Sequence, residues 1–187
     1  MLMTIYAYHM KLNKILLHTC CAPCLVYIHE KLGEMNIDFD TYFYNPNIHP
    51  FKEHQKRLQT LREYTSQFEL KLIENEEFLQ EKWDNGFKCE DCYRIRLDKT
   101  AEFAKNNGYR AFSTTLLVSI YQNHETIIGI CKDMEEKYDI EFLYHDFREG
   151  YRKGQDKARE LGLYRQKYCG CINSYNSSKF KDKISWD

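Results

Sequence analysis

Short apolar runs alternate with longer amphipathic stretches along most of the chain. The apolar runs predict five strands, at residues 14–18, 39–44, 70–73, 110–118 and 140–144. Stretches with helical periodicity predict five helices, at residues 25–33, 53–68, 92–107, 124–138 and 152–161. Strands joined in this way by helices pair in parallel through right-handed crossovers. We therefore expect an α/β fold, with a mainly parallel five-stranded sheet and helices on both faces.

Length and composition fit a folded globular protein. The chain has 187 residues, of which 43% are hydrophobic and 29% charged, and we interpret it as one domain, 1–187, with a cysteine-containing extension at about 163–187. No apolar run approaches the roughly 20 residues of a membrane span. In residues 1–14 the positive charges follow the apolar residues, the reverse of a secretory signal. We expect a cytoplasmic protein that binds no membrane.

Unusual segments follow each of the five predicted strands. They are HTCCAPC (18–24), NPNIHP (45–50), WDNGFKCEDC (83–92), SIYQNH (119–124) and HDFREGY (145–151). In a Rossmann-like or HUP-like sheet, ligands bind outside the carboxyl ends of the strands, and these segments converge there. The sequence therefore predicts a metal site at the carboxyl edge of the sheet.

The cysteines carry the strongest chemical signal. Seven of the eight fall in three tight groups: Cys20, Cys21 and Cys24; Cys89 and Cys92; Cys169 and Cys171. In a reducing compartment, clustered thiols indicate metal or redox chemistry. One tetrahedral zinc ion or one cubane iron–sulfur cluster takes about four ligands, so seven thiols suggest a cluster plus a second metal or a redox pair. Cys131 lies on an apolar helical stripe, which is typical of core packing.

Local geometry within the cysteine groups indicates how many metal centres they can hold. Adjacent residues point in different directions on helices and strands, so we expect Cys20 and Cys21 to face different, neighbouring centres. Gly170 permits a sharp turn, so Cys169 and Cys171 can do likewise or share one metal. Each CxxC pair is expected at a helix start, where the helix dipole favours thiolates.

Positive charge gathers near the carboxyl terminus although the net charge is only −1. Residues 151–168 carry six Lys or Arg against two acidic residues, with tyrosines between them. Such a stripe can follow a phosphate backbone and stack a base. A solvated helix face accounts for the charges equally well.

Several motifs together resemble the epoxyqueuosine reductase QueH family, which is iron–sulfur dependent and cobalamin independent. The resemblance runs from about residue 14 to 175 and rests on ILLHTCCAPC, YFYNPNIHP, CEDCYRIRL, FSTTLLVSIYQN, HDFREGY and YCGCINS. It implies an oxidoreductase that reduces the epoxide of epoxyqueuosine at the tRNA wobble position, which is the last step of queuosine biosynthesis.

The resemblance also implies the cofactors and their ligands. These are a [4Fe-4S] cluster and an adjacent mononuclear iron, held by the seven clustered cysteines and an aspartate. Asp146 and Asp91 lie in the right segments. We favour Asp146, because a strand end is a more rigid mount than the middle of a CxxC turn.

Further residues are expected to bind substrate or to transfer protons. Proton donors are sought among His49, Tyr121, His145 and Asp146, for each of which ordinary loop hydrogen bonding is the alternative. Phosphate contacts are expected from Arg94, Arg96, Arg148, Arg152 and Lys153, and base stacking from Tyr44 or Tyr151. The expected partners are the tRNA anticodon stem-loop and an electron donor such as ferredoxin or flavodoxin.

Two other functions remain open from sequence. One is a structural-zinc RNA-binding module without chemistry. The other is a thiol–disulfide oxidoreductase that uses Cys89 and Cys92. Neither accounts for seven thiols on converging segments.

Overall fold

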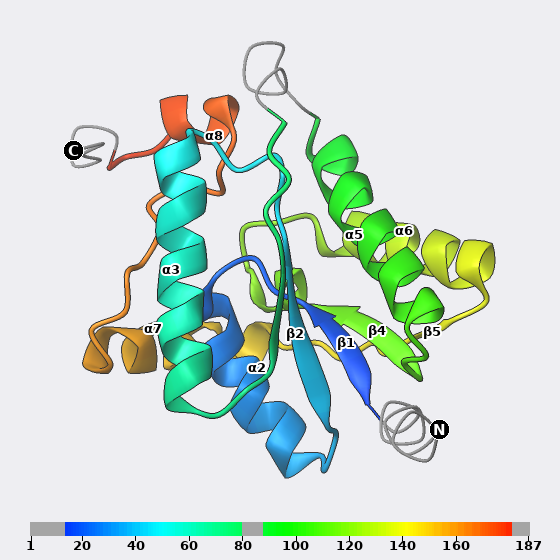
Figure 1. The fold of residues 1–187 in the computed structure, drawn as a ribbon. Helices are drawn as coiled ribbons and strands as arrows, with labels where there is room; N and C mark the ends of the chain where they lie inside the picture. The colour runs from blue at the N-terminus through cyan, green and yellow to red at the C-terminus, as the bar shows by residue number, and fades with distance from the viewer. Residues whose placement is uncertain (1–13, 80–87, 181–187) are drawn as a thin grey trace.

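Five parallel strands form one sheet in the order β3-β2-β1-β4-β5 (Figure 1). The computed structural model describes residues 14–79 and 88–180. The strands are β1 (Ile15–His18), β2 (Phe39–Tyr44), β3 (Leu72–Asn75), β4 (Ala111–Thr114) and β5 (Glu141–Phe142). The predicted α/β fold with a parallel five-stranded sheet is confirmed.

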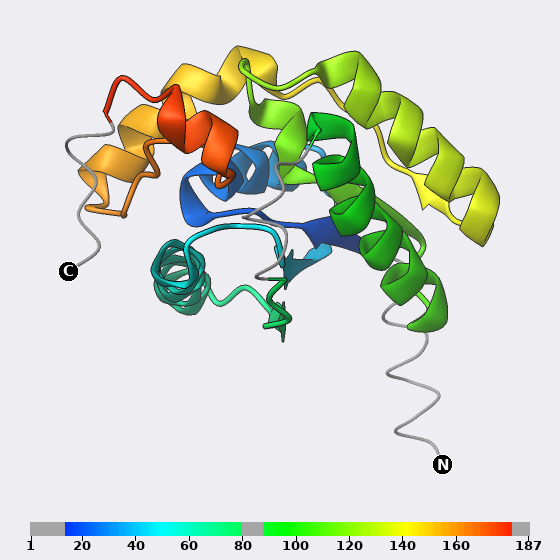
Figure 2. The same ribbon diagram turned by 90° about the horizontal axis from the view of Figure 1, so that it is seen from above.

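Helices cover both faces of this sheet. They are α2 (Ala22–Glu34), α3 (Phe51–Gln67), α5 (Cys89–Asn106), α6 (His124–Tyr138), α7 (Tyr151–Glu160) and α8 (Ile172–Asn176). Figures 1 and 2 show α2, α3 and α7 on one side of the sheet and α5 and α6 on the other. The side changes because the chain runs outward from β1 in one direction through β2 and β3, then returns to form β4 and β5.

The central strand β1 lies at the point where the strand order reverses. It pairs in parallel with β2 and with β4, with Ile15 opposite both Phe39 and Ala111. All four of its residues are buried, as expected for a strand covered on both faces. The crevice beyond the carboxyl ends of β1 and β4 is therefore the place where this topology accommodates a ligand.

Two predicted strands are much shorter than their apolar runs. Of residues 140–144, only Glu141–Phe142 is a strand. Of residues 110–118, only Ala111–Thr114 is a strand, and Thr115–Val118 forms the 3₁₀ helix η1. The Leu116 amide donates to Oγ1 of Thr114 at 3.1 Å, which starts this turn. Its residues are fully buried, so they show the same unbroken apolar pattern as a core strand.

Two helices also begin earlier than predicted, so that their first turns include cysteines. α2 begins at Ala22 and α5 at Cys89, three residues before the predicted starts. Both CxxC pairs therefore lie at helix starts, as predicted. The five-residue helix α8 was not predicted, because so short and polar a segment has no readable periodicity.

No helix in residues 14–79 and 88–180 combines the length and apolar character needed to cross a bilayer. Residues 163–180 pass beside α3 and the carboxyl edge of the sheet (Figure 1). The division of the chain into a domain and an extension stays a prediction.

A buried histidine on α3 makes stability depend on pH. His54 is 1% exposed and lies among the rings of Phe43, Phe51 and Phe78. Burial, and then the charges of Arg57 and Arg96, lower the pKa of His54 to about 4. The ordinary pKa of histidine is 6.5. At pH values between about 4 and 6.5, His54 is therefore protonated in the unfolded chain but neutral in the folded chain.

We therefore expect His54 to lower the free energy of unfolding by about 3 kcal/mol as pH drops from about 6.5 to about 4. Urea unfolding at several pH values in this range measures the slope. His54→Phe keeps an aromatic ring and removes the titrating group, so its slope should be smaller. Equal slopes for the two proteins would contradict this role of His54.

Candidate metal centre

Three sulfur atoms meet at the carboxyl end of β1. The Sγ atoms of Cys20, Cys21 and Cys24 all lie within 4.8 Å of one another. The side chains are 5%, 1% and 7% exposed, so this triad is shielded from solvent. Cys20 follows β1 after Thr19, Cys21 is the N-cap of α2, and Cys24 lies in its first turn. A β1–α2 turn at the reversal of strand order thus places three soft ligands in one buried spot.

The expectation that the Cys20 and Cys21 side chains point apart is wrong. Their sulfur atoms are 3.6 Å apart. The expectation assumed regular helix or strand geometry, but Cys21 is an extended N-cap residue, with φ −174° and ψ 161°, directly before a helix. At this junction two adjacent side chains point to the same side, so both thiols can bind one centre.

The triad stabilises negative charge on sulfur. Contacts with the Cys21 and Cys24 thiols lower the pKa of Cys20 well below its ordinary range. Burial raises the pKa of Cys21, and the contact with Cys20 raises that of Cys24. The position of the triad at the positive end of α2 also favours negative charge on sulfur. A thiophilic metal cation has the charge and softness to bind all three.

A second group of thiols lies on the turn before α8. The Sγ atoms of Cys169 and Cys171 are 3.7 Å apart, and Oγ of Ser174 lies 2.9 Å and 3.5 Å from them. Hydrogen bonding to Cys169 lowers the pKa of Cys171 to about 5. This pair is more exposed than the triad.

The third group occupies the first turn of α5. Cys89 is exposed and Cys92 partly buried. Burial raises the pKa of Cys92, and charges on Cys171 and Cys89 add to this effect. The Tyr93 hydroxyl is likewise within electrostatic range of Cys89, Cys92 and Cys169. Two thiol pairs that are distant in sequence therefore lie within electrostatic range of each other, although among the described residues only the triad has three sulfur atoms within 4.8 Å of one another.

The NPNIHP segment connects these two pairs. Asn47 accepts a hydrogen bond from Nε of Arg96 at 2.8 Å, and its amide nitrogen lies 3.5 Å from the Cys92 carbonyl oxygen. The His49 amide donates to the Gly170 carbonyl at 2.7 Å. Gly170 has φ +122°, and a Cβ there would lie 3.0 Å from Cγ1 of Ile48. This close approach requires glycine between the two cysteines.

A buried ion pair on α3 holds the carboxyl-terminal thiols in place. Nε of Arg57 donates to Oε1 of Glu53 at 2.7 Å, and the two side chains are 2% and 1% exposed. The other Arg57 nitrogens donate to the carbonyls of Tyr168 at 2.8 Å and Cys169 at 2.9 Å. The sequence did not indicate this role of Arg57, because the carbonyls that it binds are more than a hundred positions away.

Two further residues that the sequence did not indicate contact the triad. Nε2 of Gln166 lies 3.0 Å from Sγ of Cys21 and 3.8 Å from Sγ of Cys24. Oγ1 of Thr115 accepts from the Cys20 amide at 3.1 Å and lies 3.5 Å from the Cys20 sulfur. Thr115 lies inside the predicted strand 110–118 and Gln166 lies outside every predicted strand and helix, so the sequence offers no signal for either contact.

The predicted aspartate ligand is engaged elsewhere. Asp146 forms a two-point ion pair with Arg148, with oxygen–nitrogen distances of 2.8 Å and 2.6 Å, and is not in the 4.8 Å sulfur group. The Arg148 guanidinium lowers the pKa of Asp146 to about 2, so the carboxylate is ionised. The alternative, Asp91, is exposed in the first turn of α5.

Three residues predicted to meet substrate are buried. Tyr44 is 5% exposed and donates to Glu77 at 3.1 Å, and Arg96 is 3% exposed and donates to Asn47. Nε2 of His49 lies 2.8 Å from the Leu79 carbonyl oxygen, and this side chain is 1% exposed. In these positions they support the site rather than offer groups at its surface.

The other predicted residues lie nearer the surface. Tyr121 is 80% exposed, and its ring meets that of Tyr151 edge-on at a centroid distance of 5.6 Å. Burial raises the pKa of Tyr151 to about 12, and charges on Tyr121, Cys24 and Cys21 act in the same direction. Arg152 is exposed, and His145 is partly buried beside Phe147. Lys153 forms an ion pair with Glu30, and Arg94 forms one with Asp133.

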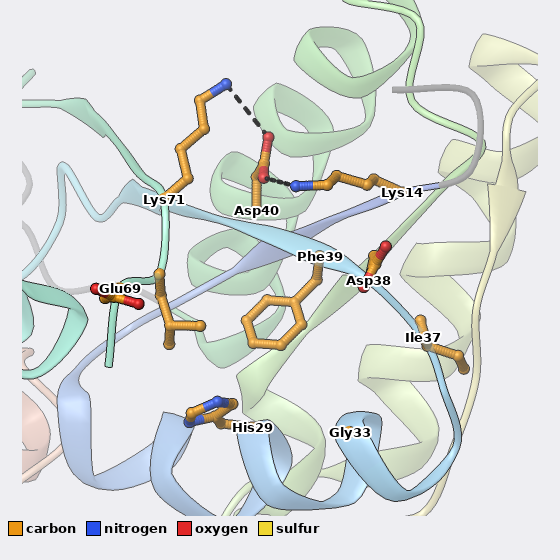
Figure 3. A pocket seen from close by; sticks show the side chains of 10 residues that line it. Lys14, His29, Gly33, Ile37, Asp38, Phe39, Asp40, Glu69 and Lys71 are labelled. Atoms are coloured by element: carbon orange, nitrogen blue, oxygen red, sulfur yellow. Dashed lines mark hydrogen bonds and ion pairs between the residues drawn. The ribbon is translucent and has the colours of Figure 1, made fainter. Parts of the chain in front are cut away.

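A cavity of about 320 Å³ lies at the opposite edge of the sheet. Figure 3 shows Asp40 there between Lys14 and Lys71, whose Nζ atoms are 3.1 Å and 3.4 Å from its carboxylate oxygens. Tyr109 also donates to Asp40 at 2.8 Å. These residues lie at the amino ends of the strands, so the cavity is separate from the cysteines.

Comparisons with known proteins agree with the motifs. Residues 15–177 match the sequence model of the family described as epoxyqueuosine reductase QueH. A Dehalococcoides mccartyi protein named epoxyqueuosine reductase QueH is 34% identical over 167 residues, 86% of this chain and 92% of that protein. A Thermotoga maritima protein of the same name is 37% identical over 180 residues, 87% and 91% of the two chains. The chain therefore belongs to the epoxyqueuosine reductase QueH family.

Proposed function

We propose that this chain reduces the epoxide of epoxyqueuosine in tRNA to the alkene of queuosine. The observation that carries this proposal is the family match over residues 15–177, which includes all seven clustered cysteines. The overall reaction consumes two electrons and two protons and releases the epoxide oxygen as water. The protein must therefore deliver two electrons to the epoxide, as its carbon–oxygen bonds break, and two protons to the departing oxygen.

The arrangement of thiols supports two metal centres. The triad supplies three ligands to one ion and leaves a further position for another ligand, as catalytic sites with three protein ligands do. Cys89, Cys92, Cys169 and Cys171 supply the four ligands that a cubane cluster requires. We therefore assign the mononuclear iron to the triad and the [4Fe-4S] cluster to the other four thiols, with an aspartate, Asp146 or Asp91, as the further ligand.

The donor set fits these groups. The triad is buried among thiols and amide or hydroxyl donors, and the Arg57 guanidinium lies within electrostatic range of Cys21. When bound, the cluster and the iron supply single electrons and a Lewis acid for the epoxide oxygen. Chemical analysis of anaerobically purified protein should give about five irons and about four sulfides per chain.

The surface beside the triad supports recognition of an unstacked base. Tyr121 and Ile120 are 80% and 54% exposed, and the partly buried Tyr151 connects them to the thiols. Arg152 is exposed on the first turn of α7 and can reach a phosphate. A wobble base held against Tyr121 would place its modified group near the triad.

Replacing Tyr121 with alanine should weaken binding of an anticodon stem-loop by about tenfold, because one stacked base contributes about 1–3 kcal/mol. The side chain is exposed, so stability should not change. Fluorescence anisotropy with a labelled stem-loop measures the affinity. Met35→Ala, at the end of α2 beside the opposite edge of the sheet, is the matched control. Equal affinity in both variants would contradict the proposed stacking.

Two observations test this function against its alternatives. Anaerobic incubation with epoxyqueuosine-containing tRNA and a chemical reductant should convert the nucleoside to queuosine, which nucleoside mass spectrometry detects. A structural-zinc module would be colourless and inactive. A thiol–disulfide oxidoreductase would remain active on disulfides after metal removal. Absence of queuosine with fully loaded protein would reject the proposal.

The remaining parts of the proposal concern partners. The physiological electron donor is of the ferredoxin or flavodoxin class, which supplies electrons singly, and the reaction takes place in the cytoplasm. The exposed Cys89 marks a place where such a donor can approach the cluster.

A further inference from the structure

Gln166 donates to the triad from a segment outside the cysteine motifs. Its Nε2 atom is 3.0 Å from Sγ of Cys21 and 3.8 Å from Sγ of Cys24. Its amide oxygen is buried and has no hydrogen-bond partner among the described residues. Among the described residues, the sulfur atoms of Cys21 and Cys24 are therefore the hydrogen-bond partners of this amide.

The position of Gln166 is fixed on both sides by the same buried ion pair. Before it in sequence, the Tyr164 hydroxyl donates to Oε2 of Glu53 at 2.6 Å. After it, Arg57 donates to the carbonyls of Tyr168 and Cys169. A segment bound to α3 at both ends can hold one amide against one sulfur, which a free loop does not do.

We propose that Gln166 is a positioning residue that raises the reduction potential of the metal centre on the triad. An N–H···S hydrogen bond stabilises negative charge on a ligating sulfur, and the reduced centre carries one more negative charge than the oxidised centre. The bond therefore favours the reduced state. This inference rests on the proposed function, because it requires a redox-active metal on the triad.

The hydrogen bond to Cys21 also differs from the other polar contact of the triad. Oγ1 of Thr115 is 3.5 Å from Sγ of Cys20, half an ångström longer than the Gln166 contact, and Thr115 already accepts from the Cys20 amide. The shorter bond comes from Gln166, whose amide oxygen has no hydrogen-bond partner among the described residues. Removing Gln166 should therefore change the potential more than removing the Thr115 hydroxyl.

The test compares Gln166→Met with wild type in anaerobically loaded, full-length protein. Methionine keeps the length of the side chain and removes the N–H donor. Stepwise reduction with dithionite, followed by electron paramagnetic resonance, measures the midpoint potential. We expect unchanged iron content and about a tenfold smaller ratio of reduced to oxidised centre at a fixed potential, a shift of about 59 mV to more negative values for a one-electron couple.

Two further variants define the cause. Gln67→Met replaces an exposed glutamine at the opposite end of α3 and should leave the potential unchanged. Gln166→Glu replaces the donor by a carboxylate and should shift the potential in the same direction as Gln166→Met.

Each outcome separates this inference from the proposed function. An unchanged potential in Gln166→Met with full iron content would overturn the inference and leave the proposed function standing. Loss of iron from this variant would also overturn it, because the amide would then hold the site together rather than tune it. Wild-type protein without redox-active iron would overturn the proposed function itself.

Discussion

Replacing Cys24 with serine is expected to remove iron from the triad and to reduce turnover of epoxyqueuosine by at least about 100-fold. Cys24 is one of three sulfurs within 4.8 Å of one another, so its loss leaves a metal ion with two protein thiols in the triad. The serine oxygen is harder and lies closer to the backbone, so it does not replace the thiolate. Iron analysis and turnover of the same preparation measure both effects.

Cys131→Ala provides the matched control for this variant. Cys131 is fully buried on α6 within the hydrophobic core, which confirms its predicted packing role. Its replacement should cost about 1–2 kcal/mol of stability and leave iron content and turnover unchanged. Full iron content and wild-type turnover in Cys24→Ser would contradict the assignment of the triad.

Replacing Arg57 with methionine is expected to destabilise the fold by about 3–5 kcal/mol. The change leaves the Glu53 carboxylate buried without its cation and removes the donors to the Tyr168 and Cys169 carbonyls. The free energy of unfolding from urea titration measures the loss. Because Arg57 holds the backbone at Cys169, bound iron should also fall.

The double variant Glu53→Gln/Arg57→Met separates the ion pair from its surroundings. Neutralising Glu53 removes the unpaired buried charge, so the double variant should be more stable than Arg57→Met alone. The control is Arg62→Met, on the same helix, whose partners Glu74 and Glu76 are at the surface; it should cost less than about 1 kcal/mol. Similar losses for Arg57→Met and Arg62→Met would contradict the role of the buried pair.

The order of strands and helices was readable because local patterns determine it. Ile15–His18 is an unbroken apolar run, which suits a central parallel strand covered on both faces. The position of the site at the carboxyl edge followed from the topology, since each unusual segment spans or borders the connection from a strand to the next helix. Errors arose where a buried turn has the composition of a strand, as at Thr115–Val118.

The details of the site were not readable, because they depend on contacts between distant residues. The direction of the Cys21 side chain follows from an extended N-cap, which the sequence does not reveal. The contacts of Arg57 and Gln166 join residues 111 to 145 positions apart. Neither residue stands in a recognisable cysteine motif.

Residues that the sequence motifs predicted together as site residues differ in burial. Tyr44 and His49 lie in segments that reach the site, yet both side chains face the interior. Tyr121 lies in a comparable segment and is the exposed residue. Polar and aromatic residues at a strand end serve either purpose, and only packing decides which.

Anomalous diffraction at the iron absorption edge, from crystals grown without oxygen, tests the central claim most directly. We predict one iron bonded to the sulfurs of Cys20, Cys21 and Cys24, and a separate iron cluster bonded to Cys89, Cys92, Cys169 and Cys171. An iron signal away from these sulfurs, or a zinc signal in its place, would contradict the account.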